Sequence, residues 1–132
     1  MSGVLLDTSA YSAFRNGDAP AVEVVRVADR VCFTPVVLGE LRAGFASGTR
    51  RAQNEQALNA FLMGNRIDIL TIDAETSAFY AAISLSLRSS GTPIPTNDMW
   101  IAATAMQHGL ELVTFDRDFL NVNQVIVRYL GD

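Results

Sequence analysis

Residues 4–9 read VLLDTS, three apolar residues followed at once by a carboxylate and two hydroxyl side chains. A short run of this kind predicts a strand over 4–7 that is buried on both faces, as in a parallel sheet. The hydroxyls predict that a helix begins next, with Thr8 or Ser9 as its N-cap. Asp7 would then lie at the carboxyl end of the strand, where open α/β sheets carry functional groups. Taken alone, Asp7 is explained equally well as a helix cap.

Strand and helix patterns alternate along the rest of the chain. This alternation predicts βαβ units, and hence an α/β fold with a mostly parallel sheet in a single domain over 1–132. Glycines and prolines mark most of the boundaries, for example Pro35 at a first helical turn and Gly109 after a last one. We predict helices over 8–17, 19–30, 35–48, 50–64, 74–90 and 96–109, and further strands over 30–35, 66–73, 110–116 and 123–130.

Composition excludes several classes of function. The chain has 132 residues and a net charge of −4, and its ten basic residues are all arginine. Without lysine, Walker-type phosphate loops, Schiff-base chemistry and Ser–Lys catalysis are excluded. The single cysteine, Cys32, lies in an apolar run and is expected to be a buried thiol rather than a nucleophile. No run approaches the ~20 apolar residues of a membrane helix, and no leader is recognised, so we expect a cytoplasmic protein.

Three further acids are predicted to lie near Asp7. Asp116 follows the strand over 110–116, and Glu40 borders the apolar stripe of the helix over 35–48. Asp98 shares the inward face of its helix with Ile101. Two like charges ~4 Å apart repel by about 4 kcal/mol at an effective dielectric of ~20. Since no lysine can neutralise them, a convergence of these acids favours a hard divalent cation, Mg²⁺ or Mn²⁺.

With their neighbours, these acids resemble the PIN-domain ribonucleases, specifically the toxin half of VapBC-type toxin–antitoxin pairs. The matching segments are VLLDTSAY at 4–11, TPVVLGELRAG at 34–44 and TNDMWIAATAMQHGLELVTFDRDF at 96–119. Each motif is weak alone, but together they span most of the chain in the order of the family. The resemblance implies a PIN-like three-layer α/β/α sandwich around a mostly parallel sheet.

The resemblance also implies an Mg²⁺- or Mn²⁺-dependent endoribonuclease that hydrolyses RNA phosphodiester bonds with metal-activated water. Carried over by position, Asp7, Glu40 and Asp98 resemble the three core acids, which hold the metal. Asp116 resembles the fourth, although Asp118 lies two residues further along. We choose Asp116 because it follows the strand directly. Glu40 is expected either to bind the metal or to orient the attacking water.

Polar neighbours of the acids are expected to support the site. Thr8 and Ser9 resemble the family's hydroxyls beside the first acid and would orient Asp7 or a metal-bound water, while Asn97 and Thr114 would do the same near Asp98 and Asp116. Helix capping is the alternative for all four residues. Arginine binds phosphate through two parallel hydrogen bonds, so the arginines nearest in sequence to the acids are candidate RNA contacts. These are Arg15 and Arg42.

Three other carboxylate-based α/β families do not fit the sequence. A haloacid-dehalogenase-like phosphatase needs an acid where Ser9 stands, a response-regulator receiver needs a lysine, and a dinucleotide-binding domain needs a glycine-rich turn after the first strand. The remaining alternative is a catalytically silent PIN-like module that binds RNA or protein. Among partners, the resemblance implies a cognate VapB-type antitoxin, which inserts a tail into the acidic groove, and a homodimer.

Overall fold

The computed structural model describes residues 3–132, and a five-stranded sheet forms its centre. The strand order is β3-β2-β1-β4-β5, and all four pairings are parallel. The predicted parallel sheet is therefore confirmed, with the first strand in the middle of it. The strands are β1 (Gly3–Leu6), β2 (Arg30–Phe33), β3 (Ile67–Ile69), β4 (Glu111–Thr114) and β5 (Val127–Tyr129).

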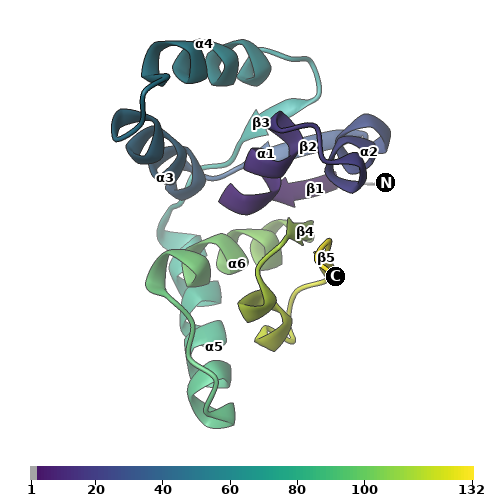
Figure 1. Ribbon diagram of the computed structural model, residues 1–132. Coiled ribbons are helices and arrows are strands. Elements are labelled where there is room, and N and C mark those ends of the chain that lie inside the picture. Colours follow the sequence, from purple (N-terminus) through teal and green to yellow (C-terminus); the bar gives the residue numbers. More distant parts are fainter. Residues whose placement is uncertain (1–2) are drawn as a thin grey trace.

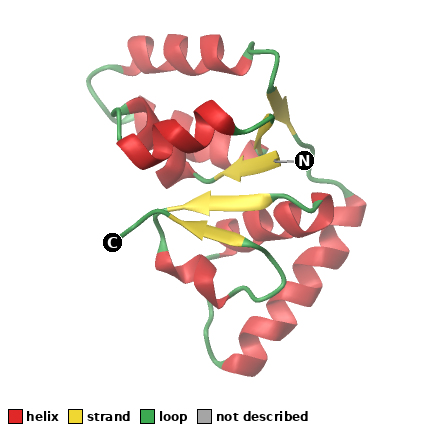
Figure 2. Ribbon diagram, turned by 90° about the vertical axis from the view of Figure 1, so that its right-hand side faces the viewer, coloured by secondary structure: helices red, strands yellow, loops and turns green. Residues whose placement is uncertain are grey.

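Helices cover both faces of this sheet, which gives the three-layer sandwich (Figures 1 and 2). The first four helices lie on one side, and the next two lie on the other together with a 3₁₀ helix. Right-handed crossovers explain this division, because the chain moves outward from β1 to β3 and then returns to the opposite side of β1. The helices are α1 (Thr8–Arg15), α2 (Ala19–Val27), α3 (Pro35–Ala46), α4 (Arg51–Leu62), α5 (Ala74–Ser90), α6 (Thr96–His108) and η1 (Arg117–Asn121).

The central strands carry the most deeply buried side chains. Leu5 of β1, Cys32 of β2 and Leu112 of β4 are completely inaccessible to solvent. Strands covered by helices on both faces need apolar side chains in both directions, which is why these strands read as continuous apolar runs. Cys32 is a buried core thiol, as expected. None of the helices in residues 3–132 combines the length and the apolar character that a bilayer span requires.

Some predicted boundaries were wrong, each for a local reason. The helix expected over 19–30 ends at Val27, because the chain must extend again to enter β2. The strand expected over 66–73 keeps only Ile67–Ile69, because Asp73 begins a capping box with Thr76 that starts α5. The strands expected over 110–116 and 123–130 are likewise short. The 3₁₀ helix η1 was not predicted.

The strand order reverses at β1 and β4, and this reversal positions the candidate site. Loops that leave the carboxyl ends of these two strands turn to opposite faces of the sheet and open a crevice between them. Asp7 follows β1 at that edge, and Asp116 follows β4. Helices α3 and α6 begin close to the same edge and contact each other, so Glu40 and Asp98 are brought towards it.

Candidate functional site

A pocket of about 440 Å³ lies at the carboxyl edge of the sheet. The four acids singled out in the sequence all line it, although they come from four separate parts of the chain. The structure therefore brings together the residues on which the sequence-based hypothesis depends. The full lining is Asp7, Thr8, Ser9, Glu40, Pro95, Asp98, Ile101 and Asp116.

Asp7 is the most buried of these acids, with 4% of its surface exposed. Its Oδ1 accepts hydrogen bonds from the Ser9 hydroxyl at 2.7 Å and from the Ala10 N–H at 2.8 Å. Its Oδ2 accepts one from the Thr114 hydroxyl at 2.6 Å. Asp7 is thus the N-cap of α1, in place of the predicted Thr8 or Ser9, and it lines the pocket as well. Helix capping and a place in the functional site are therefore compatible explanations of Asp7.

Glu40 is held by two residues that we expected elsewhere. The Thr8 hydroxyl donates to Glu40 Oε1 at 2.5 Å, and the Asn97 side chain donates to Oε2 at 3.2 Å. Thr8 therefore bonds to Glu40 and not to Asp7, which was one of the two partners expected for it, and Asn97 bonds to Glu40 and not to Asp98. Asn97 also makes no cap, because α6 begins after Pro95 without a side-chain cap. These bonds fix a carboxylate on α3 from both α1 and α6.

Ser9 and Thr114 link the two strand ends. The Ser9 hydroxyl accepts a hydrogen bond from the Phe115 N–H at 2.9 Å while it donates to Asp7. Thr114 Oγ1 likewise accepts from the Asp116 N–H at 2.9 Å while it donates to Asp7. The loop that carries Asp116 is therefore tied to the loop that carries Asp7.

Asp116 and Asp118 belong to the same cluster. Choosing Asp116 alone as the fourth acid therefore left out Asp118. Asp116 caps η1, with its Oδ1 accepting from the Asp118 N–H at 2.9 Å. Within residues 3–132, Asp98, Asp116 and Asp118 each offer an oxygen within 4.8 Å of the others. Asp118 could have been found from the sequence only if TFDRDF had been recognised as a tight turn. The predicted strand over 110–116 did not include such a turn.

The crowding of acids changes their protonation. Loss of water on burial, followed by the charges of the neighbouring carboxylates, raises the pKa of Asp98 to about 7. Burial also raises the pKa of Asp7, while the hydrogen bonds from Thr114, Ser9 and Ala10 act in the opposite direction. The pocket is therefore short of positive charge at neutral pH.

The donor set fits a hard divalent cation. Every charged side chain that lines the pocket is a carboxylate, and Mg²⁺ and Mn²⁺ prefer oxygen ligands. The hydroxyl and amide bonds to Asp7 and Glu40 supply the outer support that ligand carboxylates usually have. A cation among Asp98, Asp116 and Asp118 would relieve their mutual repulsion.

The two candidate arginines lie outside this pocket. Arg42 forms an ion pair with Glu55 of α4 and donates to Asn59 Oδ1 at 3.3 Å, so its guanidinium is directed to α4. The hypothesis that Arg42 contacts phosphate therefore has no support in its side-chain contacts. Arg15 lies in the last turn of α1 and lines a different pocket.

Comparisons with known proteins agree with this geometry. A family profile described as "PIN domain" matches residues 4–125. The chain is 35% identical to ribonuclease VapC4 of Mycobacterium tuberculosis over 92 residues, which cover 70% of this chain and 71% of the relative. It is 31% identical to ribonuclease VapC5 of the same organism over 115 residues, which cover 87% and 84% of the two chains.

A solved structure of VapBC-5 from Mycobacterium tuberculosis, a member of the VapBC family of toxin–antitoxin systems, has a similar fold. Its TM-score is 0.77 at 29% sequence identity, and the match covers 98% of this chain and 100% of that one. The three-layer arrangement and the parallel sheet are therefore those of VapC-like proteins.

The raised pKa of Asp98 predicts how stability depends on pH. Because the pKa of Asp98 is about 7 in the folded chain against an ordinary value of 3.8, the folded state binds the extra proton, and stability falls as pH rises between these values. In EDTA, the melting temperature of the wild type should fall from pH 5 to pH 8, and Mg²⁺ should raise it more at pH 8.

Asp98→Asn should weaken both the fall in melting temperature with rising pH and the larger effect of Mg²⁺ at pH 8. Glu75→Gln, on the first turn of α5, should keep both. Differential scanning fluorimetry across the pH range measures both. An Asp98→Asn protein whose melting temperature depends on pH as in the wild type would contradict the raised pKa of Asp98.

Thr114 should contribute more to stability than an equally buried threonine elsewhere. Thr114→Val removes a hydrogen bond to a buried carboxylate, and such bonds contribute about 1.5–3 kcal/mol. Thr104→Val is the matched control, because this hydroxyl only donates back to the Trp100 carbonyl within α6. Urea unfolding in EDTA at pH 8 should show the larger loss for Thr114→Val.

The loss caused by Thr114→Val should shrink at lower pH, where Asp7 is protonated and its carboxylate no longer needs the donor. Equal losses for the two threonine variants at pH 8 would show that the Thr114 bond does not stabilise the Asp7 carboxylate.

Proposed function

The chain belongs to the PIN-domain family, with VapC ribonucleases among its relatives, and on this premise we propose that it is a metal-dependent endoribonuclease and the toxin of a VapBC-type pair. One observation carries the proposal: Asp7, Glu40, Asp98 and Asp116 line a single pocket. The relatives named above are ribonucleases, which supports RNA as the substrate. The toxin would act on RNA in the cytoplasm.

We assign the cation to the carboxylates at the ends of β1 and β4 and on α6. Asp98, Asp116 and Asp118 would hold it, with Asp7 on the buried side of the same pocket. When bound, Mg²⁺ or Mn²⁺ would lower the pKa of a water molecule and neutralise charge on a phosphate oxygen. An acidic pocket could then accept a polyanion.

The other residues would position the reacting groups. Thr114 and Ser9 keep the Asp7 carboxylate in one orientation, and Thr8 and Asn97 do the same for Glu40. Glu40 has both oxygens engaged by protein donors and lies outside the group of three mutually close carboxylates. We therefore favour a role in which Glu40 accepts a hydrogen bond from the attacking water and orients it in line with the phosphodiester bond.

A catalytically silent module that binds RNA or protein is the competing function. Such a module would have no need for four acids in one pocket, where their repulsion lowers stability. The hydrogen bonds that orient Asp7 and Glu40 also favour catalysis over simple binding, because binding does not require a fixed carboxylate geometry.

Replacing an acid at constant shape tests the catalytic assignment. Asp7→Asn and Asp98→Asn should each reduce Mg²⁺-dependent cleavage of cellular RNA by at least about a hundredfold, because a carboxylate charge that would help to hold the cation is lost. EDTA should abolish cleavage by the wild type, and Mg²⁺ or Mn²⁺ should restore it.

The Glu75→Gln protein, which carries the same loss of charge outside the pocket, should cleave like the wild type. Circular dichroism confirms that each variant is folded. Wild-type rates in folded Asp7→Asn and Asp98→Asn proteins would refute the assignment.

We propose two protein partners, a second copy of the chain and a VapB-type antitoxin. The solved relative from a VapBC toxin–antitoxin system supports the antitoxin, and the acidic pocket offers a complementary site for a basic tail. The chain has a mass of 14.3 kDa, so a homodimer should elute with twice that mass in light-scattering chromatography. Co-expression with the antitoxin should give a larger complex that no longer cleaves RNA. A 14.3-kDa species at all concentrations would exclude the homodimer.

A further inference from the structure

A second pocket, of about 180 Å³, lies between α1, α3 and α4. It shares no lining residue with the acidic pocket and is far larger than the roughly 15 Å³ that one buried water needs. These three helices belong to the helical layer formed by the first half of the chain (Figure 1). The lining residues are Tyr11, Ser12, Arg15, Asn16, Phe45 and Asn54.

Tyr11 gives this pocket an unused hydrogen-bond donor. The residue is 1% exposed, and its hydroxyl has no hydrogen-bond partner in the part of the chain that the structure describes. Its ring is held by edge contacts with Phe33 and Phe61, each with ring centroids 5.8 Å apart. Buried hydroxyls are nearly always paired, because an unpaired one loses its bonds to water. The protein thus leaves one buried donor unpaired on a residue that lines this pocket.

Arg15 supplies positive charge in the same pocket. Across residues 3–132, its guanidinium makes no ion pair or side-chain hydrogen bond, and its charge lowers the pKa of Tyr11 against the larger effect of burial. The guanidinium and the hydroxyl therefore act on the same region. A ligand that satisfies both must be an anion with oxygen acceptors.

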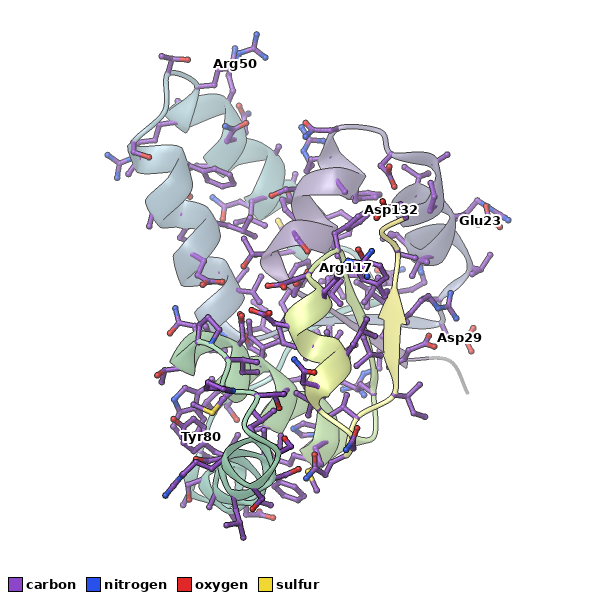
Figure 3. All side chains as sticks on the ribbon, turned by 60° about the horizontal axis from the view of Figure 1, so that its bottom comes forward. Glu23, Asp29, Arg50, Tyr80, Arg117 and Asp132 are labelled. Carbon is purple, nitrogen blue, oxygen red and sulfur yellow. The ribbon has the colours of Figure 1, made fainter. Side chains whose placement is uncertain are left out.

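The start of α4, a few residues before the lining residue Asn54, is basic as well. Helix α4 has twelve residues and no side-chain cap, so the N–H groups of its first turn are free to bind an anion. Arg50 and Arg51 are exposed at this end, and Figure 3 shows Arg50 at the tip of the molecule. The nearby Glu55 is already paired with Arg42. In a chain of net charge −4, this is a locally basic surface.

We propose that the pocket between α1, α3 and α4 binds a backbone phosphate of the RNA strand that is cut at the acidic pocket, with Tyr11 and Arg15 as its ligands. This inference rests on the proposed ribonuclease function. Both pockets use α1, and Ser9 and Arg15 are separated by about 9 Å along the helix axis. That separation exceeds the roughly 3.4 Å per nucleotide of a duplex strand, so the phosphate would lie a few nucleotides from the cut. Arginine suits it because its guanidinium pairs with phosphate oxygens.

The salt dependence of RNA binding tests the inference directly. The probe is a fluorescein-labelled single-stranded RNA of mixed sequence, measured by anisotropy with Mg²⁺ present, in an Asp98→Asn background that keeps the RNA intact. Arg15→Gln should weaken binding about fivefold or more and reduce the slope of log K against log[KCl] by about 0.7, the value for one lost phosphate contact with a single strand. Arg88→Gln, near the end of α5 in the opposite layer, is the matched control and should change neither (Figure 1).

Tyr11→Phe separates a ligand role from a structural one. Loss of a hydroxyl that bonds only to RNA should weaken binding by about threefold or more without changing the salt slope. The melting temperature of the free protein should stay unchanged or rise, because an unpaired buried donor is removed. A lower melting temperature together with unchanged RNA affinity would overturn the assignment of Tyr11.

Equal affinities and slopes for Arg15→Gln and Arg88→Gln would overturn the phosphate site. So would a result in which Arg15→Gln leaves RNA binding intact but weakens the complex with the co-expressed antitoxin, since the pocket would then accept an acidic side chain of that protein. The proposed function fails separately, if wild-type protein with Mg²⁺ cleaves no RNA. If the wild type cleaves RNA while Arg15→Gln keeps both the affinity and the salt slope of the wild type, only the phosphate site is rejected.

Discussion

Repulsion among carboxylates at one edge of the sheet is the constraint on which the rest of the site depends. The acids come from the ends of β1 and β4 and from two helices that begin at the same edge, so the fold itself forces them together. Asp7 is almost fully buried there and depends on donors from Ser9, Ala10 and Thr114. Those bonds do not reach Asp98, where burial and, after it, the charges of the neighbouring carboxylates raise the pKa to about 7 and disfavour the charged form. A cation is the simplest partner that would stabilise the charged form.

The same hydrogen bonds explain how the site keeps one geometry. Thr114 connects Asp7 with the loop that carries Asp116, and Thr8 and Asn97 connect Glu40 with α1 and α6. The Asn97 bond joins helices from the two layers, the Thr8 bond joins two helices of one layer, and the Thr114 bond to Asp7 joins the ends of two strands. Side chains that are far apart in sequence therefore restrain one another. This is the arrangement expected where carboxylates must keep fixed directions during a reaction.

Charge is unevenly distributed over a chain that contains no lysine. Carboxylates concentrate in one pocket, whereas Arg15, Arg50 and Arg51 lie around the second pocket and the start of α4. Five other arginines form ion pairs within residues 3–132, as Arg42 does with Glu55. A polyanionic strand would therefore be attracted by the basic side and accepted by the acidic side once a cation is present. The separation of the basic side from the acidic pocket would then orient the bound strand.

Local patterns in the sequence were sufficient for the order of strands and helices and for the parallel sheet. They made a convergence of Asp7, Glu40, Asp98 and Asp116 plausible, and the resemblance to PIN-domain ribonucleases assigned these four acids to one site. Apolar runs, caps and helix faces depend on neighbours within a few residues, and strand ends in a parallel sheet meet at one edge. Only the tertiary structure decided that Thr8 and Asn97 bind Glu40, that Asp118 joins the cluster and that Arg42 turns to α4. Those contacts depend on how α1, α3, α4 and α6 pack across the sheet, and packing distances between separate elements are not encoded in the periodicity of any one of them.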